Sequence, residues 1–223
     1  MAEHVARFRK VLDERPIIAI LRGLQPHEAV GVGEALVAAG IRIIEVPLNS
    51  PEPFTSIARL VERFGKAAVI GAGTVRRVDE VEQLARIGAG LVLSPHCDPE
   101  LIRGTVAAGM VSIPGILTPT EAFAALDAGA HALKLFPMEV MGLAGARALK
   151  AVLPAGTCML AVGGVSESNA KSFLEAGLHG MGVGSALYKP GDSAGDIRLH
   201  AENFVRALHG GSWPILPNVS GRT

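Results

Sequence analysis

The sequence has few cysteines and no excess of charge. Cys97 and Cys158 are the only cysteines in 223 residues. Two are too few for a disulfide framework or a cysteine-based zinc site, so we expect two reduced thiols. Lys+Arg and Asp+Glu both number 21, so no overall positive field would attract nucleic acid or an anionic membrane. A charged ligand must therefore be bound by local groups inside a site.

Segments for membranes, metals and dinucleotides are missing as well. The apolar stretches are interrupted well before the roughly 18 residues that a membrane span needs, and the N-terminal run MAEHVARFRKVLDERP lacks the apolar core of a signal peptide. None of the seven histidines pairs with another ligand at a metal-type spacing, and no G-x-G-x-x-G run opens a helix after the first predicted strand. We therefore expect a cytoplasmic protein with no cofactor, no metal, no membrane partner and no nucleic-acid partner.

What the sequence does contain is a repeated alternation of short β-type runs and longer segments of helical periodicity, separated by glycine and proline. The predicted strands are Ile17–Leu21, Arg42–Val46, Ala68–Gly71, Leu91–Ser94, Met110–Ile113, Ala132–Phe136, Met159–Val162 and Gly180–Val183. The predicted helices that follow them are Pro26–Ala39, Pro51–Phe64, Val78–Ile87, Pro99–Ala108, Thr120–Ala128, Leu143–Val152, Ser168–Ala176 and Ala194–Leu208.

Eight strand–helix units with nearly continuous apolar strands fit a parallel barrel better than an open doubly wound sheet. We predict an α/β protein with one domain, a (β/α)8 TIM barrel over residues 1–210. An amphipathic helix over Glu3–Asp13 is expected to cap the bottom of this barrel. Residues 211–223 form a tail with two prolines and no periodicity, which is either docked on the barrel or disordered.

Strand parity predicts which polar side chains enter the barrel. Catalytic groups of such barrels lie at the C-terminal ends of the strands, and side chains alternate between the interior and the helix layer. Lys134 shares a face with Ala132 and Phe136, and Glu45 lies on the face opposite Ile44 and Val46. We expect Lys134 and Glu45 to meet at the mouth of the barrel.

Two more polar residues lie at the ends of predicted strands, one after the first strand and one after the third. Arg22 is in register with Ile18 and Ile20, and Thr74 is in register with Ile70 and Ala72. By the same parity argument, Arg22 and Thr74 are expected to join Lys134 and Glu45.

These residue types suit one kind of chemistry. Lysine is almost never fully buried unless it is paired or functional, and burial beside a cation lowers its pKa and yields the neutral amine that attacks a ketone. Glu45 is suited to moving protons, and Arg22 to binding a substrate carboxylate through two parallel hydrogen bonds. Structural ion pairs among Lys134, Glu45 and Arg22 are the alternative.

The loops after the last two strands favour phosphate. Val162 to Val165 (VGGV) follow the seventh strand, and Gly184 with Ser185 follows the eighth. Loops at these two places of a barrel frequently bind phosphate through backbone N–H groups, and glycine lets the backbone approach the anion. Tight turns also need glycine, so each pair alone is weak evidence.

Five segments, in order and on the predicted strands, resemble the 2-keto-3-deoxy-6-phospho-aldonate aldolases: IAILRG (18–23), EVPLNSP (45–51), GAGT (71–74), KLFP (134–137) and AVGG (161–164). The resemblance covers roughly residues 10 to 210. It implies a metal-independent class I aldolase that acts on a phosphorylated sugar acid and is commonly a homotrimer. Lys134 would form the Schiff base and Glu45 would be the proton shuttle.

The resemblance also assigns substrate contacts. Arg22 and Thr74 would bind the carboxylate end of the pyruvyl group, and the glycines with Ser185 would bind phosphate. Asn49 and Val162 look like the 6-phosphogalactonate branch, because the gluconate branch usually has arginine at the first position. Pro95 lies near the mouth after the fourth strand, and Phe136 either stacks on substrate or packs in the core. The residues expected to bind substrate are Arg22, Asn49, Thr74, Pro95, Phe136, Val162, Gly163, Gly164, Gly184 and Ser185.

The expected reaction is cleavage of 2-dehydro-3-deoxy-6-phosphogalactonate to pyruvate and D-glyceraldehyde 3-phosphate. Three alternatives remain open. The same chemistry would serve 2-dehydro-3-deoxy-6-phosphogluconate or 4-hydroxy-2-oxoglutarate. The chain would otherwise be a phosphate-binding barrel enzyme that is not an aldolase, or a sugar-phosphate sensor without catalysis.

Overall fold

The computed structural model of the chain describes residues 3–208, 214 and 216. Within them the helices are α1 (Glu3–Glu14), α2 (Ala29–Ala38), α3 (Pro53–Phe64), α4 (Val78–Arg86), α5 (Pro99–Ala107), α6 (Pro119–Asp127), α7 (Met138–Val152), α8 (Glu167–Glu175) and α9 (Ala194–Ala207). The strands are β1 (Ile17–Ile20), β2 (Ile43–Pro47), β3 (Val69–Gly73), β4 (Leu91–Leu93), β5 (Val111–Ile113), β6 (Gly115–Ile116), β7 (Leu133–Leu135), β8 (Met159–Val162) and β9 (Gly180–Val183).

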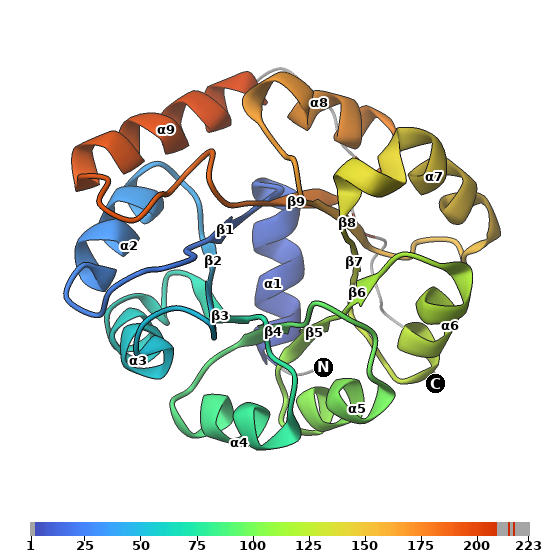
Figure 1. The fold of residues 1–223 in the computed structure, drawn as a ribbon, viewed down its shortest axis with the longest axis horizontal. Coiled ribbons are helices and arrows are strands. Elements are labelled where there is room, and N and C mark those ends of the chain that lie inside the picture. Colours follow the sequence, from blue (N-terminus) through green and yellow to red (C-terminus); the bar gives the residue numbers. More distant parts are fainter. Residues whose placement is uncertain (1–2, 209–213, 215, 217–223) are drawn as a thin grey trace.

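The strands form one parallel sheet in the order β5-β4-β3-β2-β1-β9-β8-β7-β6, and the helices α2 to α9 surround it (Figure 1). The predicted (β/α)8 barrel is confirmed. The predicted fifth strand, Met110–Ile113, agrees with β5, but the short strand β6 was not predicted; Pro114, which has no N–H for the ladder, separates the two. The Pro114 carbonyl still accepts a hydrogen bond from the Lys134 backbone N–H (2.9 Å), so both pieces occupy one position in the barrel.

Alternation along the strands sorts the buried side chains into two clusters. Ile44, Val46, Leu133 and Leu135 pack with the helix layer, whereas Ala132 belongs to the cluster inside the barrel. The parity argument therefore holds for Lys134 and Glu45, whose neighbours in sequence point outward. It holds for Arg22 as well, because Ile18, two strand positions behind Ile20, lies in the inner cluster.

The prediction that Thr74 shares the inward face of β3 with Ile70 and Ala72 is wrong. Ile70 and Ala72, with which it was placed in register, pack toward the helices. The inward positions of β3 are instead Gly71 and Gly73, and Thr74 lies beyond the strand with a φ of 57°. A residue in this left-handed conformation does not continue the alternation of the strand before it.

Helix α1 closes the bottom of the barrel, as predicted, and Figure 1 shows it across the centre of the ring. Its buried residues Phe8 and Leu12 belong to the inner cluster together with Ile18 and the first residues of several strands. Most of the predicted 211–223 tail lies outside the described residues. Leu216 is described: it is 7% exposed, packs in the inner cluster, and its N–H donates to Asp13 Oδ1 (3.1 Å). The boundary near residue 210 stays a prediction.

None of the described helices combines the length and the apolar character that crossing a membrane requires.

Candidate active site

Lys134 lies in the middle of β7 with its side chain inside the barrel. It is 8% exposed, its Nζ donates to the Ser94 carbonyl (3.4 Å), and it lies 4.3 Å from the centroid of the Phe136 ring. Burial lowers the pKa of Lys134 below its usual range; the Glu45 carboxylate opposes this shift and the Arg22 guanidinium adds to it. More of the lysine is therefore a neutral amine, which is the nucleophilic form.

Glu45 lies on β2, two strands from β9 in the sheet, and is 4% exposed. Its Oε2 is buried without a hydrogen-bond partner. Burial raises the pKa of Glu45 to about 7, although Lys134, Arg22 and a hydrogen bond from the Gly73 backbone all act to lower it. A buried polar atom without a partner costs about 1–3 kcal/mol. Glu45 is therefore placed to exchange protons near neutral pH with a group that enters the site.

Gly73 makes room for the Glu45 carboxylate. The two residues lie on adjacent strands, and a Cβ added at Gly73 would overlap with both carboxylate oxygens of Glu45. No side chain larger than hydrogen fits there unless the carboxylate moves. The GAGT segment thus contributes to the site by leaving the space that the Glu45 carboxylate occupies.

We expect Gly73→Ala to lower activity by about 100-fold, because misplacing a reacting group by about 1 Å has an effect of that size. Circular dichroism should show the fold retained. Gly31→Ala is the matched control, because a Cβ at Gly31 in α2 would meet no atom within 4 Å. Steady-state kinetics on both variants checks the prediction, and equal rates would show that the position of the carboxylate is unimportant.

Arg22 is exposed at the mouth of the barrel, where β1 ends. One of its terminal nitrogens, Nη1, donates to Asn49 Oδ1 (2.8 Å), and the next residue, Gly23, donates its N–H to Ser50 Oγ (2.9 Å). The loop after β2 thereby fixes the guanidinium, and its remaining N–H groups, which make no hydrogen bond within the described residues, suit an oxygen anion. Asn49 orients Arg22 in this structure.

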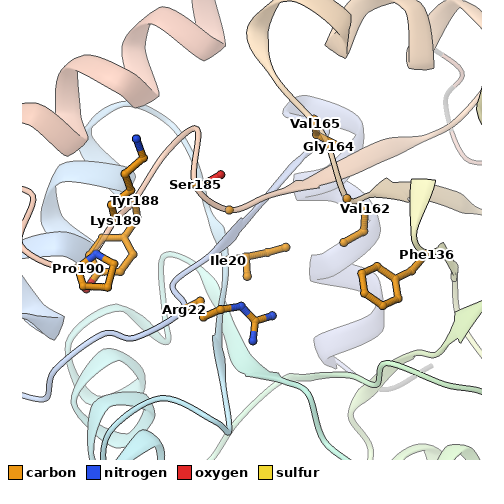
Figure 2. Close-up of a pocket in the computed structure, with 12 residues that line it drawn as sticks. Ile20, Arg22, Phe136, Val162, Gly164, Val165, Ser185, Tyr188, Lys189 and Pro190 are labelled. Atoms are coloured by element: carbon orange, nitrogen blue, oxygen red, sulfur yellow. The ribbon is translucent and has the colours of Figure 1, made fainter. Parts of the chain in front are cut away.

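A pocket of about 350 Å³ opens beside Arg22 and Phe136 (Figure 2). It brings together seven of the predicted substrate-binding residues: Arg22, Phe136, Val162, Gly163, Gly164, Gly184 and Ser185. Asn49 reaches it only through Arg22, and neither Thr74 nor Pro95 lines it. Pro95 instead packs its backbone against Gly115. Lys134 and Glu45 do not line this pocket but are buried beside two residues that do, since Lys134 contacts Phe136 and the charge of Arg22 acts on Glu45.

The loop after β8 has the backbone geometry of an anion site. Gly163 and Gly164 have φ values of 104° and 64°, which favour glycine. Helix α8 begins directly afterwards, and Ser166 caps its N-terminus. Backbone N–H groups and a helix N-terminus together attract phosphate.

Sequence reasoning missed the pocket residues Ile20, Val165, Tyr188, Lys189 and Pro190. Ile20 was recognised as inward-facing but not as part of a pocket wall. For Lys189 the available signal was a basic residue four positions after Ser185. Within the described residues, no group of three or more His, Cys, Asp or Glu side chains is arranged to hold a metal ion.

Known proteins are similar to this chain along most of its length. A family model described as KDPG and KHG aldolase matches residues 8–197. A probable 2-dehydro-3-deoxy-6-phosphogalactonate aldolase of Rhizobium meliloti (strain 1021) is 52% identical over 84% of this chain and 89% of its own. The 2-dehydro-3-deoxy-6-phosphogalactonate aldolase of Escherichia coli (strain K12) is 46% identical over 86% and 94%.

More distant relatives act on a different sugar acid by name. The 2-dehydro-3-deoxy-phosphogluconate aldolase of Dickeya dadantii (strain 3937) is 30% identical over 74% of this chain and 77% of its own.

Among solved structures, one described as native KDPGal has a TM-score of 0.85 and 46% identity, covering 86% of this chain and 93% of its own.

Proposed function

Because this chain belongs to the KDPG and KHG aldolase family and is thus a carbon–carbon lyase, we propose that it cleaves 2-dehydro-3-deoxy-6-phosphogalactonate through a Schiff base on Lys134. The products are pyruvate and D-glyceraldehyde 3-phosphate. The observation that carries this proposal is the buried Lys134 amine, with its lowered pKa, in electrostatic contact with a Glu45 whose pKa is raised to about 7.

The reaction begins when the neutral Lys134 amine attacks the C2 ketone of the substrate and water leaves, giving an iminium ion. Glu45, in its ionised form, takes the proton of the C4 hydroxyl directly or through a water. The electrons of the C3–C4 bond then flow into the iminium, and the aldehyde departs. Protonation of the resulting enamine at C3 and hydrolysis release pyruvate and free Lys134.

The pocket residues bind the two charged ends of the substrate. Arg22, oriented by Asn49, binds the carboxylate beside Lys134. Gly163, Gly164, Gly184 and Ser185 bind the phosphate through backbone N–H groups and the serine hydroxyl. Phe136 covers the Lys134 amine and screens the iminium from water.

The galactonate substrate is favoured over the gluconate one by the relatives. Those named for phosphogalactonate are 52% and 46% identical, against 30% for the one named for phosphogluconate. We expect kcat/KM for the galactonate epimer to exceed that for the gluconate epimer by about tenfold or more, because a few contacts at C4 are worth about 1–3 kcal/mol. A coupled assay of pyruvate release from both pure epimers tests this. A reversed preference would assign the chain to gluconate chemistry.

We also propose that the protein acts in galactonate catabolism in the cytoplasm as a homotrimer. The trimer rests on the resemblance to the family. Light scattering coupled to size-exclusion chromatography should give three times the chain mass of 23.1 kDa, and a monomer at working concentration would refute it.

A further inference from the structure

Tyr188, Lys189 and Pro190 line the pocket in the loop after β9, and nothing so far gives them a role. Figure 2 shows them on the side of the pocket where Ser185 also lies. Ser185 belongs to the proposed phosphate site, so this loop borders the end of the pocket that receives the phosphate.

The residues on either side of Lys189 are anchored. The Tyr188 hydroxyl donates to Glu28 Oε2 (3.3 Å), and Tyr188 is 3% exposed. Burial, with Glu28 nearby, raises the pKa of Tyr188 to about 12, so the hydroxyl keeps its proton and remains a donor.

Pro190 packs on the loop after β1. A Cβ added at Gly23 would lie 2.8 Å from Pro190 Cγ, and Gly23 has a φ of 85°. Both features require glycine at this position. Since Gly23 follows Arg22 directly, the loop after β9 packs against the loop that carries Arg22.

Lys189 itself is free to meet a ligand. Its side chain is exposed, and its backbone N–H donates to Asp192 Oδ2 (2.8 Å). Across the described part of the chain, no hydrogen bond or ion pair engages its ammonium group. The backbone of Lys189 is therefore fixed while its charge remains available.

The charged side chains around the pocket indicate what the Lys189 ammonium group would bind. The only cationic side chains among the pocket residues described are Arg22 and Lys189, and Arg22 is already engaged by Asn49. The Glu139 carboxylate lies against Gly163, where a Cβ would overlap with it. A phosphate, with about −1.5 to −2 charges near pH 7, needs a cation to offset this acidic neighbour.

We propose that Lys189 binds the phosphate of the substrate through its ammonium group, and that Tyr188 and Pro190 are positioning residues that hold it at the pocket rim. This rests on the proposed function in requiring a phosphorylated substrate. It adds to the backbone glycine site a side-chain cation that favours phosphorylated over unphosphorylated sugar acids.

Lys189→Gln tests the proposal. We expect KM for 2-dehydro-3-deoxy-6-phosphogalactonate to rise about tenfold, as for the loss of a charged hydrogen bond, with kcat nearly unchanged because the contact is made equally in the ground and transition states. Inhibition by inorganic phosphate should weaken by a similar factor. Lys171→Gln is the matched control, because Lys171 lies on α8, outside the pocket, and pairs with Glu175 at 3.8 Å.

Tyr188→Phe removes only the anchoring hydroxyl. We expect KM to rise a few-fold in the single variant but not to rise further when the change is made on Lys189→Gln. Such non-additivity is the signature of a residue that acts through another. Fully additive effects would overturn the positioning role of Tyr188.

Two different outcomes separate the role of Lys189 from the proposed function. If the wild type cleaves the phosphorylated substrate and Lys189→Gln leaves KM and phosphate inhibition unchanged, the role of Lys189 is wrong and the proposed function stands. If the wild type forms no borohydride-trapped pyruvate adduct and cleaves no phosphorylated substrate, the proposed function is wrong and this inference falls with it.

Discussion

Lys134→Ala should reduce turnover by at least about 10,000-fold, the order seen when a covalent nucleophile is removed. Without the amine no iminium forms, and the electrons of the C3–C4 bond have no acceptor. The same variant should give no adduct when incubated with pyruvate and sodium borohydride. In the wild type, mass spectrometry should find a single pyruvate-derived adduct, and peptide mapping should locate it on Lys134.

The control must separate loss of the nucleophile from loss of fold. Lys134 is 8% exposed and packs against Phe136, so Lys134→Met preserves more of its volume than alanine does. Both variants should unfold cooperatively and lack activity. Near-native turnover in either folded variant would contradict Schiff-base catalysis and return the chain to the phosphate-binding barrels that need no lysine.

Much of the barrel, with its buried Lys134 and Glu45, follows from periodicity. The strand and helix ranges were predictable because buried parallel strands are short apolar runs that glycine and proline terminate. The positions of Lys134 and Glu45 followed from alternation, since each has large apolar neighbours that must face the helices. One polar residue at the centre of such a strand has only the barrel interior left to enter.

Where local pattern ends, prediction fails. The short strand β6 was not predicted, because Pro114, which has no N–H for the ladder, ends the apolar run of the fifth strand before it. Thr74 was placed inward from its register with Ile70 and Ala72, but those residues pack toward the helices, and Thr74 lies past the end of β3 with a left-handed backbone. Register along a strand therefore does not by itself tell which of the two faces is the inner one.

The pocket rim depends on contacts between distant parts of the chain. Tyr188 bonds to Glu28, which is 160 residues away, and Pro190 packs on Gly23. Neither pairing leaves a periodic signal. A single sequence can predict which strand residues face the barrel interior, but it does not predict which loops contact each other at the mouth of the barrel.

Glu45→Gln should lower kcat/KM by about 100- to 10,000-fold, the range for removal of a general acid–base group. In the wild type the rate should rise with pH through a midpoint near 7, because Glu45 acts as a base only when ionised and its pKa is about 7. The variant should lack this rising limb. A profile with the same midpoint in both proteins would assign the titration to another group.

Although Glu45→Gln should lower activity, it should raise the free energy of unfolding. The pKa of Glu45 rises from its ordinary value of 4.5 to about 7 on folding, so between these values the folded protein binds a proton more tightly than the unfolded chain does. Folding is therefore favoured at low pH, and this contribution is lost as pH rises through about 7. The shift corresponds to up to about 3 kcal/mol.

Glutamine carries no charge at any pH, so the variant does not lose the stability that the wild type loses when the buried Glu45 carboxylate ionises. The free energy of unfolding of Glu45→Gln should thus exceed that of the wild type by more at pH 8 than at pH 5, although the lost attraction to Lys134 offsets part of the gain. Urea unfolding of both proteins at the two pH values measures the difference. If the pH dependence is the same for both, Glu45 does not titrate as a buried acid, and its role as the proton carrier loses its physical basis. If the variant is more stable and nearly inactive at pH 8, the protein sacrifices folding free energy to hold an ionised carboxylate beside its lysine.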